Sequence, residues 1–429
     1  MGGCYTVGMA RVSPFIGLVF DESVVGPLGP VTAPPYDSIS AEHERRLHSA
    51  SPHNVVRLIL GRDEPGDDDL HDKYTRAADL LRAWRDQRAL RATAEPSWFL
   101  YEMRFTFQGE SRRVRGVVAE VEIEQLGGGI VPHEATLPGP IEDRMRLLRS
   151  VRANLSPVYA LLRGPQPGVG AAFERAASAR DADVHVSDEQ GVEHRMWIVP
   201  AGWTGANAPG GASSTASGAS STAGSSASSP GDPARRPDIG QVLGGERLLI
   251  ADGHHRYAVA LAFRERMRAE VGPGPWDRMM MLLVDASTED PPVLPIHRVM
   301  LRGGPPAAGH RVRDLAEVLA AVDDDQLMYG SAAREGDELV HRVAQLRGRP
   351  PTVCALHEQV LGKAALRFQP DAAAAEEAVR LGEAPAAFFL PPTHVDRIRA
   401  VIENGGTLPQ KSTYFWPKPR TGMVIRPLA

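Results

Sequence analysis

The chain has 429 residues, of which 42% are hydrophobic and 24% are charged, a composition typical of a soluble globular protein long enough for two or three domains. Its net charge of −5 at pH 7 argues against broad binding to nucleic acid or to a membrane surface, because both need a basic face. The two cysteines cannot form a disulfide framework, and no segment reaches the roughly 20 apolar residues of a membrane span. We therefore expect a cytoplasmic protein.

The first 203 residues carry signals for both helices and strands. APPYDSIS (33–40) predicts a rigid turn, because two prolines fix the backbone, followed by a helix that Ser40 caps. HNVVRLIL (53–60) is typical of a buried strand, and 67–90 has apolar residues at helical spacing. The alternating segment 97–124 predicts an antiparallel hairpin about a QGES turn. Further helix and strand patterns occupy 141–155 and 173–200.

Residues 204–237 form a tract of serine, alanine and glycine with no large apolar side chain. Such a tract cannot offset its ordering entropy by burial, so we expect it to be disordered. It either divides two domains or is an insertion in one surface loop, since long loops add little to the free-energy cost of folding.

The chain after this tract again mixes strands and helices. A strand is expected at 246–253, a helix at 257–270 and a buried strand at 279–285. Helical patterns follow at 312–322 and 338–346. Hairpin signals together with strand–helix–strand signals predict an α/β fold of the mixed α+β kind.

The stretch LLIADGHHRYAVAL (248–261) concentrates ligand-binding groups where a strand meets a helix. The start of a helix offers unpaired backbone amides and a partial positive charge, which attract an anion. Gly253 lets a ligand approach the backbone, and Arg256 can bind a phosphate through two hydrogen bonds. His254 and His255 can donate to phosphoryl oxygens, and their charge is tunable near neutral pH.

Asp252, at the same corner, has two interpretations. It can bind Mg²⁺ through its carboxylate, or it can simply cap the helix while the histidines are satisfied locally. A zinc site would need His254 or His255 together with His297 and a further carboxylate. Neighbouring histidines rarely bind one ion, and the sequence has no HExxH spacing.

Seven segments spread over nearly the whole chain resemble the bacterial family called domain of unknown function 1015. They are APPYDSIS, HNVVRLIL, HEATLPGPIEDR, ANLSPVYAL, ADGHHRYAVAL, LPIHRVM and QKSTYFWPKPRTGMVIR. The resemblance implies that 1–203 and 238–429 are the two parts of one α/β protein, with 204–237 as an insertion between them. The family name itself records no activity.

The Asp-Gly-His-His-Arg corner is also similar to the phosphate-binding corner of the ParB/sulfiredoxin superfamily. Sulfiredoxins carry Gly-Cys-His-Arg there, ParB proteins carry a Gly-Glu-Arg-Arg variant that binds CTP, and free-serine kinases use a related corner to hold ATP or ADP with a glutamate as base. His254 stands in place of the sulfiredoxin cysteine, and no helix-turn-helix follows. The resemblance therefore implies a nucleotide-binding element with kinase-like chemistry.

A kinase needs a group that accepts the proton of the attacking hydroxyl. We expect Glu134 to be this base, because it lies beside His133 in a proline-flanked loop that can hold a carboxylate rigidly. The alternative is an ordinary solvated loop acid. Tyr36 and Asp37, after two prolines, either frame the same pocket or form a plain turn.

Four more residues are candidates for substrate binding. Arg144 can bind a carboxylate or phosphate or form a surface ion pair, and His297 lies just past a buried strand, where it binds ligand or is structural. Lys411 and Ser412 can clamp a phosphate, although a strand that packs the aromatic residues after them would have the same pattern.

The sequence thus predicts a phosphotransferase that uses ATP or ADP with Mg²⁺ and acts on free serine or a similar hydroxylated metabolite. The corner residues would hold phosphate, with His254 and His255 also near the reacting atoms. The alternative functions are a nucleotide-binding regulatory protein without catalysis and, with less support, a ParB-like DNA-binding protein.

Overall fold

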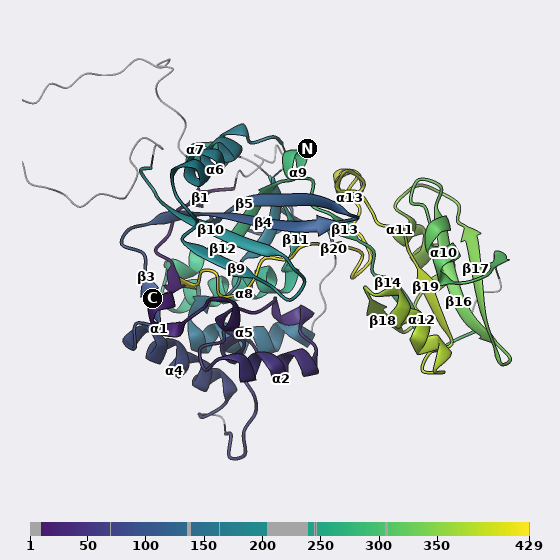
Figure 1. Cartoon of the computed structure of the whole chain (residues 1–429), viewed down its shortest axis with the longest axis horizontal. Coiled ribbons are helices and arrows are strands. Elements are labelled where there is room, and N and C mark those ends of the chain that lie inside the picture. The colour runs from purple at the N-terminus through teal and green to yellow at the C-terminus, as the bar shows by residue number, and fades with distance from the viewer. Residues whose placement is uncertain are drawn as a thin grey trace, which may run out of the picture.

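The computed structural model describes residues 10–68, 70–134, 139–162, 164–203, 239–243, 245, 247–304 and 308–428. These residues form two lobes, each built on its own β-sheet (Figure 1). Both lobes mix helices with strands, so the predicted mixed α/β class is confirmed. The tract 204–237, expected to be an insertion, lies outside the described residues, and the strands before and after it belong to one sheet.

The larger lobe contains a nine-stranded sheet in the order β6-β11-β8-β12-β5-β4-β10-β9, with β1 paired to β5. The pairs β11–β6 and β12–β8 are parallel and the others are antiparallel. The strands are β1 (Val12–Ser13), β4 (Ser97–Phe107), β5 (Glu110–Glu122), β6 (Ile130–Pro132), β8 (Val158–Leu162), β9 (Val184–Ser187), β10 (Glu193–Pro200), β11 (Leu248–Asp252) and β12 (Arg278–Asp285).

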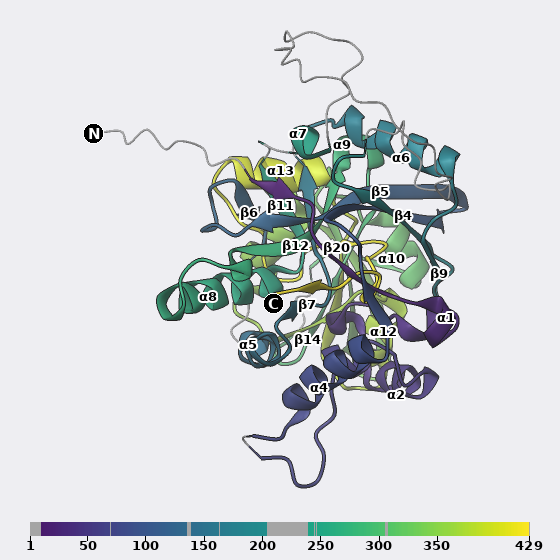
Figure 2. The same cartoon turned by 90° about the vertical axis from the view of Figure 1, so that its left-hand side faces the viewer.

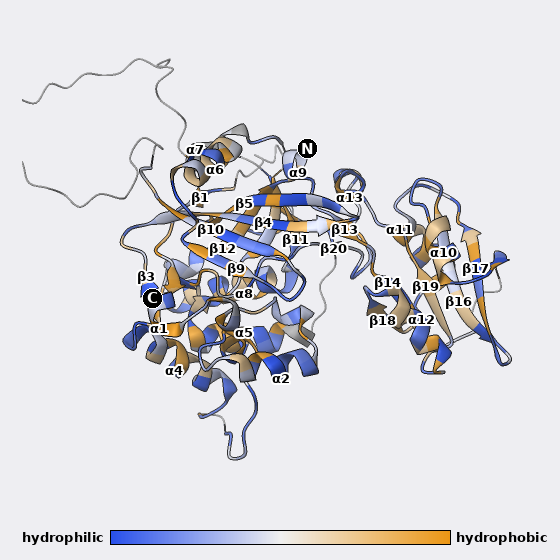
Figure 3. Cartoon of the chain, viewed as in Figure 1, coloured by the Kyte–Doolittle hydropathy of each residue, from blue (hydrophilic) through white to orange (hydrophobic). Residues whose placement is uncertain are grey.

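Helices cover both faces of this sheet. The two views agree that α6 (Pro167–Ala179) and α7 (Ile239–Leu243) lie on one side and α2 (Ala41–Ala50), α4 (Lys73–Asp86) and α5 (Gly139–Val151) on the other (Figures 1 and 2). The outer helix α2 is largely hydrophilic (Figure 3), and it buries only Leu47 and His48. No helix among the described residues is both long and apolar enough to cross a bilayer.

The smaller lobe is an antiparallel sheet of six strands in the order β15-β17-β16-β19-β14-β18. The helices α10 (Leu315–Ala321) and α12 (Ala372–Arg380) bury apolar residues against it. Its strands are β14 (His297–Met300), β15 (His310–Val312), β16 (Met328–Glu335), β17 (Glu338–Gln345), β18 (Leu366–Gln369) and β19 (Ala386–Phe389).

The chain crosses between the lobes twice. It leaves the larger lobe after β13 (Val293–Leu294) and returns through α13 (Val395–Glu403). On its return β20 (Tyr414–Phe415) pairs with β13, and β21 (Arg426–Pro427) pairs with β7 (Ala153–Asn154). The C-terminal segment therefore belongs to the larger lobe.

The strand predicted at 53–60 is wrong, because this segment forms the short helix α3 (Val56–Ile59). The side chain of Asn54 accepts a hydrogen bond from the amide of Val56 at 2.8 Å and donates to the carbonyls of Pro30 and Thr32. Asparagine side chains that bond to nearby backbone turn the chain out of an extended conformation. The apolar run is buried, as expected, but in a helix.

The helix predicted at 338–346 is also wrong, because the segment is strand β17. A two-residue loop joins it to β16, with Glu335 opposite Glu338 and Gly336 at a φ of 65°. A glycine with positive φ at the first loop position is a hairpin signal that outweighs the approximate helical spacing. The predicted hairpin 97–124, helices 67–90 and 312–322, and strand 279–285 are confirmed by β4–β5, α4, α10 and β12.

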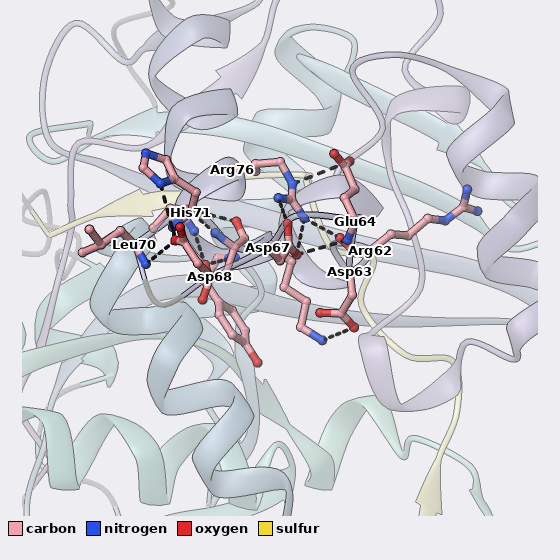
Figure 4. A network of polar contacts seen from close by, with 12 residues as sticks. Arg62, Asp63, Glu64, Asp67, Asp68, Leu70, His71 and Arg76 are labelled. Atoms are coloured by element: carbon pink, nitrogen blue, oxygen red, sulfur yellow. Dashed lines mark hydrogen bonds and ion pairs between the residues drawn. The ribbon is translucent and has the colours of Figure 1, made fainter.

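A network of charged side chains orders the loop between α3 and α4 (Figure 4). Arg76 donates two hydrogen bonds to the Asp67 carboxylate, and Lys73 pairs with Asp63 at 3.1 Å. The hydrogen bond from Arg76 lowers the pKa of Asp67 to about 2. These pairs are only partly buried, and they hold the shape of a surface loop.

A buried ion pair ties the C-terminal segment to the large sheet. Arg426, on β21, donates to Glu120, on β5, at 2.8 Å from Nε, and Arg278 donates to the same carboxylate at 2.7 Å. The side chains of Arg426 and Glu120 are only 5% and 10% exposed. Removing one partner of such a pair leaves a buried charge without compensation.

We expect the substitution Glu120→Ala to lower the free energy of unfolding by about 3–5 kcal/mol, because Arg426 stays buried and unpaired. Urea unfolding measures this loss. The matched control is Glu122→Ala on the same strand, where Glu122 faces an arginine that is 83% exposed and the pair is worth about 0–1 kcal/mol. Equal losses for the two variants would contradict the assigned role of Glu120.

Candidate functional site

The corner between β11 and α8 (His254–Glu270) has the predicted strand–glycine–helix form. Gly253 is the residue before the helix, with φ 94° and ψ 25°, and no side chain caps the helix. The expectation that Asp252 caps it is therefore wrong. A Cβ atom on Gly253 would lie 2.9–3.0 Å from three atoms of the Arg256 guanidinium group. Both the left-handed backbone and this contact require glycine.

Asp252 is held instead by two cations. It accepts hydrogen bonds of 2.7 Å from Arg256 and from Lys418, and all three side chains are at most 15% exposed. Burial raises the pKa of Asp252, but the charges of Lys418 and Arg256 outweigh it and hold the pKa well below its usual range. Arg256 also donates to Ser156 and to the carbonyl of Pro157. The guanidinium group is thus a fixed wall of the site.

Glu134 is bound by the backbone of the C-terminal segment. The amides of Lys411, Ser412 and Thr413 donate to its carboxylate at 2.9 Å each, and the Thr413 hydroxyl donates at 2.9 Å. Burial raises the pKa of Glu134, but its contacts with His133 outweigh burial, and the pKa falls to about 2. The carboxylate is therefore ionised and rigid, as expected, but it is a weak proton acceptor.

His133 lies directly behind Glu134 and is fully buried. Its Nδ1 donates to the carbonyl of Ile250 at 2.6 Å, and its Nε2 is 2.6 Å from the Thr413 hydroxyl. The ring also lies 3.3 Å from the Glu134 carboxylate, measured from Nε2 to Oε1.

His254 holds the loop of His133 against the corner. Its Nε2 accepts a hydrogen bond of 3.3 Å from the His133 amide. Burial, together with the nearby charge of His133, lowers the pKa of His254 to about 3. The ring is thus neutral near pH 7, with its proton on Nδ1. Burial also lowers the pKa of His255.

These residues surround one cavity, which is lined by four segments of the chain, 36–37, 134, 251–256 and 410–418, together with Ile296. Lys411 lines it with its backbone in a left-handed conformation, at φ 53°. Within the described part of the chain, the Lys411 ammonium group forms no hydrogen bond or ion pair. Lys411 is therefore a cation available to a ligand.

Arg298 of the smaller lobe fixes the other side of the same segment. Its guanidinium group donates to the carbonyls of Lys411 at 2.9 Å and Gln410 at 3.4 Å. Burial lowers its pKa to about 10, so it stays charged at neutral pH. The segment that carries Lys411 is thus bound through its amides by Glu134 and through its carbonyls by Arg298.

Most of the residues predicted for the site meet at this cavity. Four do not line it: His133 lies directly behind it, and the other three lie elsewhere. Ser412 donates its hydroxyl to the carbonyl of Pro409 at 2.5 Å, His297 accepts from the amide of Leu390 at 3.2 Å, and Arg144 lines a neighbouring pocket. The predicted residues that line it, or lie directly behind it, are Tyr36, Asp37, His133, Glu134, Asp252, Gly253, His254, His255, Arg256 and Lys411.

Lys418 is a residue of the site that the sequence did not reveal. Its ammonium group lies 2.7 Å from Asp252, 3.6 Å from Asp37 and 5.1 Å from the centre of the Tyr414 ring. The nearby carboxylates outweigh burial and raise the pKa of Lys418. The only signal in the sequence is its position between Pro417 and Pro419, which fixes the backbone on both sides.

Neither the Mg²⁺ site expected at Asp252 nor the zinc alternative fits this geometry. Both oxygens of Asp252 already bind cations, so this carboxylate is a poor ligand for Mg²⁺. His297, needed for the zinc arrangement, is bonded within the smaller lobe. In the described ranges, no group of three or more histidine, cysteine or acidic residues is placed to hold a metal ion.

The sequence matches the family model described as protein of unknown function (DUF1015) over residues 12–205 and 227–347. This is more than half of the chain, so the protein belongs to that family. A comparison with curated proteins found no match.

Three solved structures are similar to this chain, with low sequence identity and low TM-scores. A free serine kinase in complex with AMP is 13% identical and has a TM-score of 0.32, with 67% of this chain and 83% of that chain covered. A conserved hypothetical protein from Pyrococcus furiosus is 12% identical, with a TM-score of 0.31 and coverage of 68% and 90%. SbnI from Staphylococcus aureus, truncated at its C-terminus, is 10% identical, with a TM-score of 0.32 and coverage of 70% and 84%. TM-scores of this size do not establish a shared fold.

We expect Gly253→Ala to destabilise the protein more than a glycine substitution that introduces backbone strain alone. The control is Gly191→Ala, because Gly191 has φ 76° and no atom within 4 Å of the added Cβ. The left-handed backbone costs about 1–2 kcal/mol in both variants. Gly253→Ala should lose a further ~1–3 kcal/mol, because Arg256 must give up buried hydrogen bonds. Urea unfolding gives both values, and equal losses would mean that the guanidinium group moves freely.

The depressed pKa of Glu134 predicts a loss of stability in acid. Because its pKa falls from 4.5 to about 2 on folding, the carboxylate contributes about 3 kcal/mol above pH 4.5 and loses this contribution as the pH falls towards 2. Between pH 5 and pH 3 this group alone should account for about 2 kcal/mol of lost stability. Urea unfolding at pH 5 and at pH 3 measures this loss. Between these two pH values, Glu134→Gln should lose about 2 kcal/mol less stability than the wild type. An unchanged difference would show that Glu134 is not held as described.

Proposed function

We propose that this cavity binds the phosphate groups of ATP or ADP and that the protein transfers a phosphoryl group to free serine or a similar hydroxylated metabolite. The observation that carries this proposal is the start of α8, which has no side-chain cap, beside a cavity lined by Lys411, whose ammonium group forms no hydrogen bond or ion pair with the described residues. Backbone amides at a helix start and a lysine are a common combination for binding phosphate.

The cations of the site divide into two groups with different roles. Arg256 and Lys418 neutralise Asp252 and form a wall that is already in place before a ligand enters. Lys411 supplies the charge that the ligand phosphate compensates. Groups that are held in advance need no rearrangement during the reaction, which is the main source of electrostatic stabilisation in enzymes.

The acceptor hydroxyl would lie near Glu134, the predicted base. Its oxygen attacks the terminal phosphorus, the bond to the leaving nucleotide oxygen breaks, and the hydroxyl proton passes to Glu134 or to water. With a pKa of about 2, Glu134 orients the hydroxyl more than it removes its proton. Phosphoryl transfer passes through a loose transition state and depends mostly on positioning, so a weak base is sufficient.

Mg²⁺ would accompany the nucleotide rather than occupy a site made by the protein alone. In this proposal the phosphates hold the ion, and Asp37 is the carboxylate with remaining capacity, since its contacts with Lys418 and Ser38 are 3.5 Å or longer. Mg²⁺ commonly binds to one or two carboxylates plus substrate phosphates. A cytoplasmic location, expected from the cysteine content, would supply both the nucleotide and the ion.

A regulatory protein that binds nucleotide without turnover is the second candidate. The saturated hydrogen bonding of Glu134, which accepts from three amides and a hydroxyl, favours a structural carboxylate. DNA binding has less support, because the net charge is −5 and the cavity has as many carboxylates as cations.

Calorimetry with ATP and ADP in the presence of Mg²⁺ tests nucleotide binding, which both candidate functions require. We expect binding by the wild type and a loss of about 10–150-fold in affinity for Lys411→Ala, as one charge-assisted phosphate contact is worth about 1.5–3 kcal/mol. The control Lys363→Ala removes an exposed lysine of the smaller lobe and should leave affinity unchanged. Wild-type protein that binds neither nucleotide would exclude both candidates.

Mass spectrometry of the protein incubated with ATP, Mg²⁺ and serine or related hydroxy compounds then distinguishes the kinase from the regulatory protein. The kinase should form phosphoserine or another phosphorylated product, and Glu134→Gln should form it more slowly because the carboxylate that orients the hydroxyl is lost. Nucleotide binding with no product from any compound would leave the regulatory function.

A further inference from the structure

A second, largely apolar pocket adjoins the proposed phosphate site. It lies between α5, α8 and β7, and its apolar walls include Leu147, Leu148, Leu155 and Val259. Three of these are at most 8% exposed, while Leu148, on α5, is half-buried. The walls of the pocket are therefore mostly buried side chains, and Leu148 is partly accessible to solvent.

Two residues line both pockets. Arg256 and Tyr36 appear in the wall of the phosphate cavity and in that of the apolar pocket. Arg256 cannot swing freely, because Asp252, Ser156 and the carbonyl of Pro157 hold its guanidinium group. A ligand that extends from one pocket into the other would pass beside these two fixed side chains.

The pocket offers planar surfaces and a polar group as well as hydrocarbon. The Arg144 guanidinium lies 4.4 Å from the centre of the Tyr36 ring, and its hydrogen bond of 2.8 Å to the carbonyl of Ile59 keeps it there. The Asn154 side chain accepts from the amide of Met280 with its oxygen, while its amide nitrogen forms no hydrogen bond to any residue in the described ranges. Stacked planes and a free amide donor suit a flat heterocycle that carries ring nitrogens.

From this geometry we infer that the apolar pocket binds the base of the nucleotide whose phosphates enter the cavity beside Gly253. This inference rests on the proposed nucleotide binding and adds a second subsite to it. The base would lie against the apolar side chains of α5 and α8, with Tyr36 and Arg144 as its planar neighbours, while Asn154 donates to a ring nitrogen. Such stacking contributes binding energy that inorganic phosphate chains cannot obtain.

Calorimetry with Mg²⁺ and two probes, ATP and inorganic tripolyphosphate, tests the inference. We expect the wild type to bind ATP at least about fivefold more tightly than tripolyphosphate, because a stacked base is worth about 1–3 kcal/mol. The substitution Leu148→Trp fills the rim of the pocket. It should weaken ATP binding to about the level of tripolyphosphate and leave tripolyphosphate binding unchanged.

The matched control is Leu319→Trp on α10, where the leucine is 40% exposed and belongs to the other lobe. It should change neither affinity, and thermal unfolding should show that both variants are folded. Equal wild-type affinities for the two probes, or ATP binding that Leu148→Trp leaves intact, would overturn the base pocket while phosphate binding stands. Failure of the wild type to bind either probe would instead remove the proposed function and this inference with it.

Discussion

The carboxylate of Glu134, bound by three successive amides of the C-terminal segment, is the interaction on which the site depends. It joins the loop after β6 to residues 411–413 across most of the length of the chain. Lys411 and Lys418 reach the cavity only because this segment is held there. A carboxylate that accepts several backbone hydrogen bonds is strongly stabilised in its charged form, which is why one acidic residue can fix a segment that has little regular secondary structure of its own.

Charge balance is the second organising feature. Asp37, Glu134 and Asp252 face Arg256, Lys411 and Lys418 around one cavity. Buried ion pairs add little to stability, since desolvation offsets most of their attraction. Their effect here is to fix positions: five of the six groups are bonded to one another or to the backbone, and Lys411 remains available to a ligand. A site arranged in this way meets an incoming anion without having to reorganise its own dipoles.

The sequence predicted those parts of the site that depend on local structure. The strand, Gly253 and the helix lie within a few residues of one another, so their form follows from turn chemistry. The role of Asp252 does not follow from local structure, because its partner Lys418 lies 166 positions further along the chain. The helix α3 depends on side-chain bonds from Asn54 to residues 22–24 positions earlier. Likewise, the approximate helical spacing at 338–346 could not be distinguished from a strand until the loop at Gly336 was taken into account.

The pairing of β13 with β20 gives the smaller lobe a particular topological status. Both ends of the lobe emerge from this short two-stranded ribbon. The smaller lobe is therefore one long insertion in the larger lobe, and the two ends of the insertion are paired. The entropy of closing such an insertion depends only weakly on its length. Relatives could therefore enlarge, shrink or exchange the smaller lobe without rewiring the nine-stranded sheet, provided that an arginine equivalent to Arg298 still binds the carbonyls of the returning segment at residues 410–411.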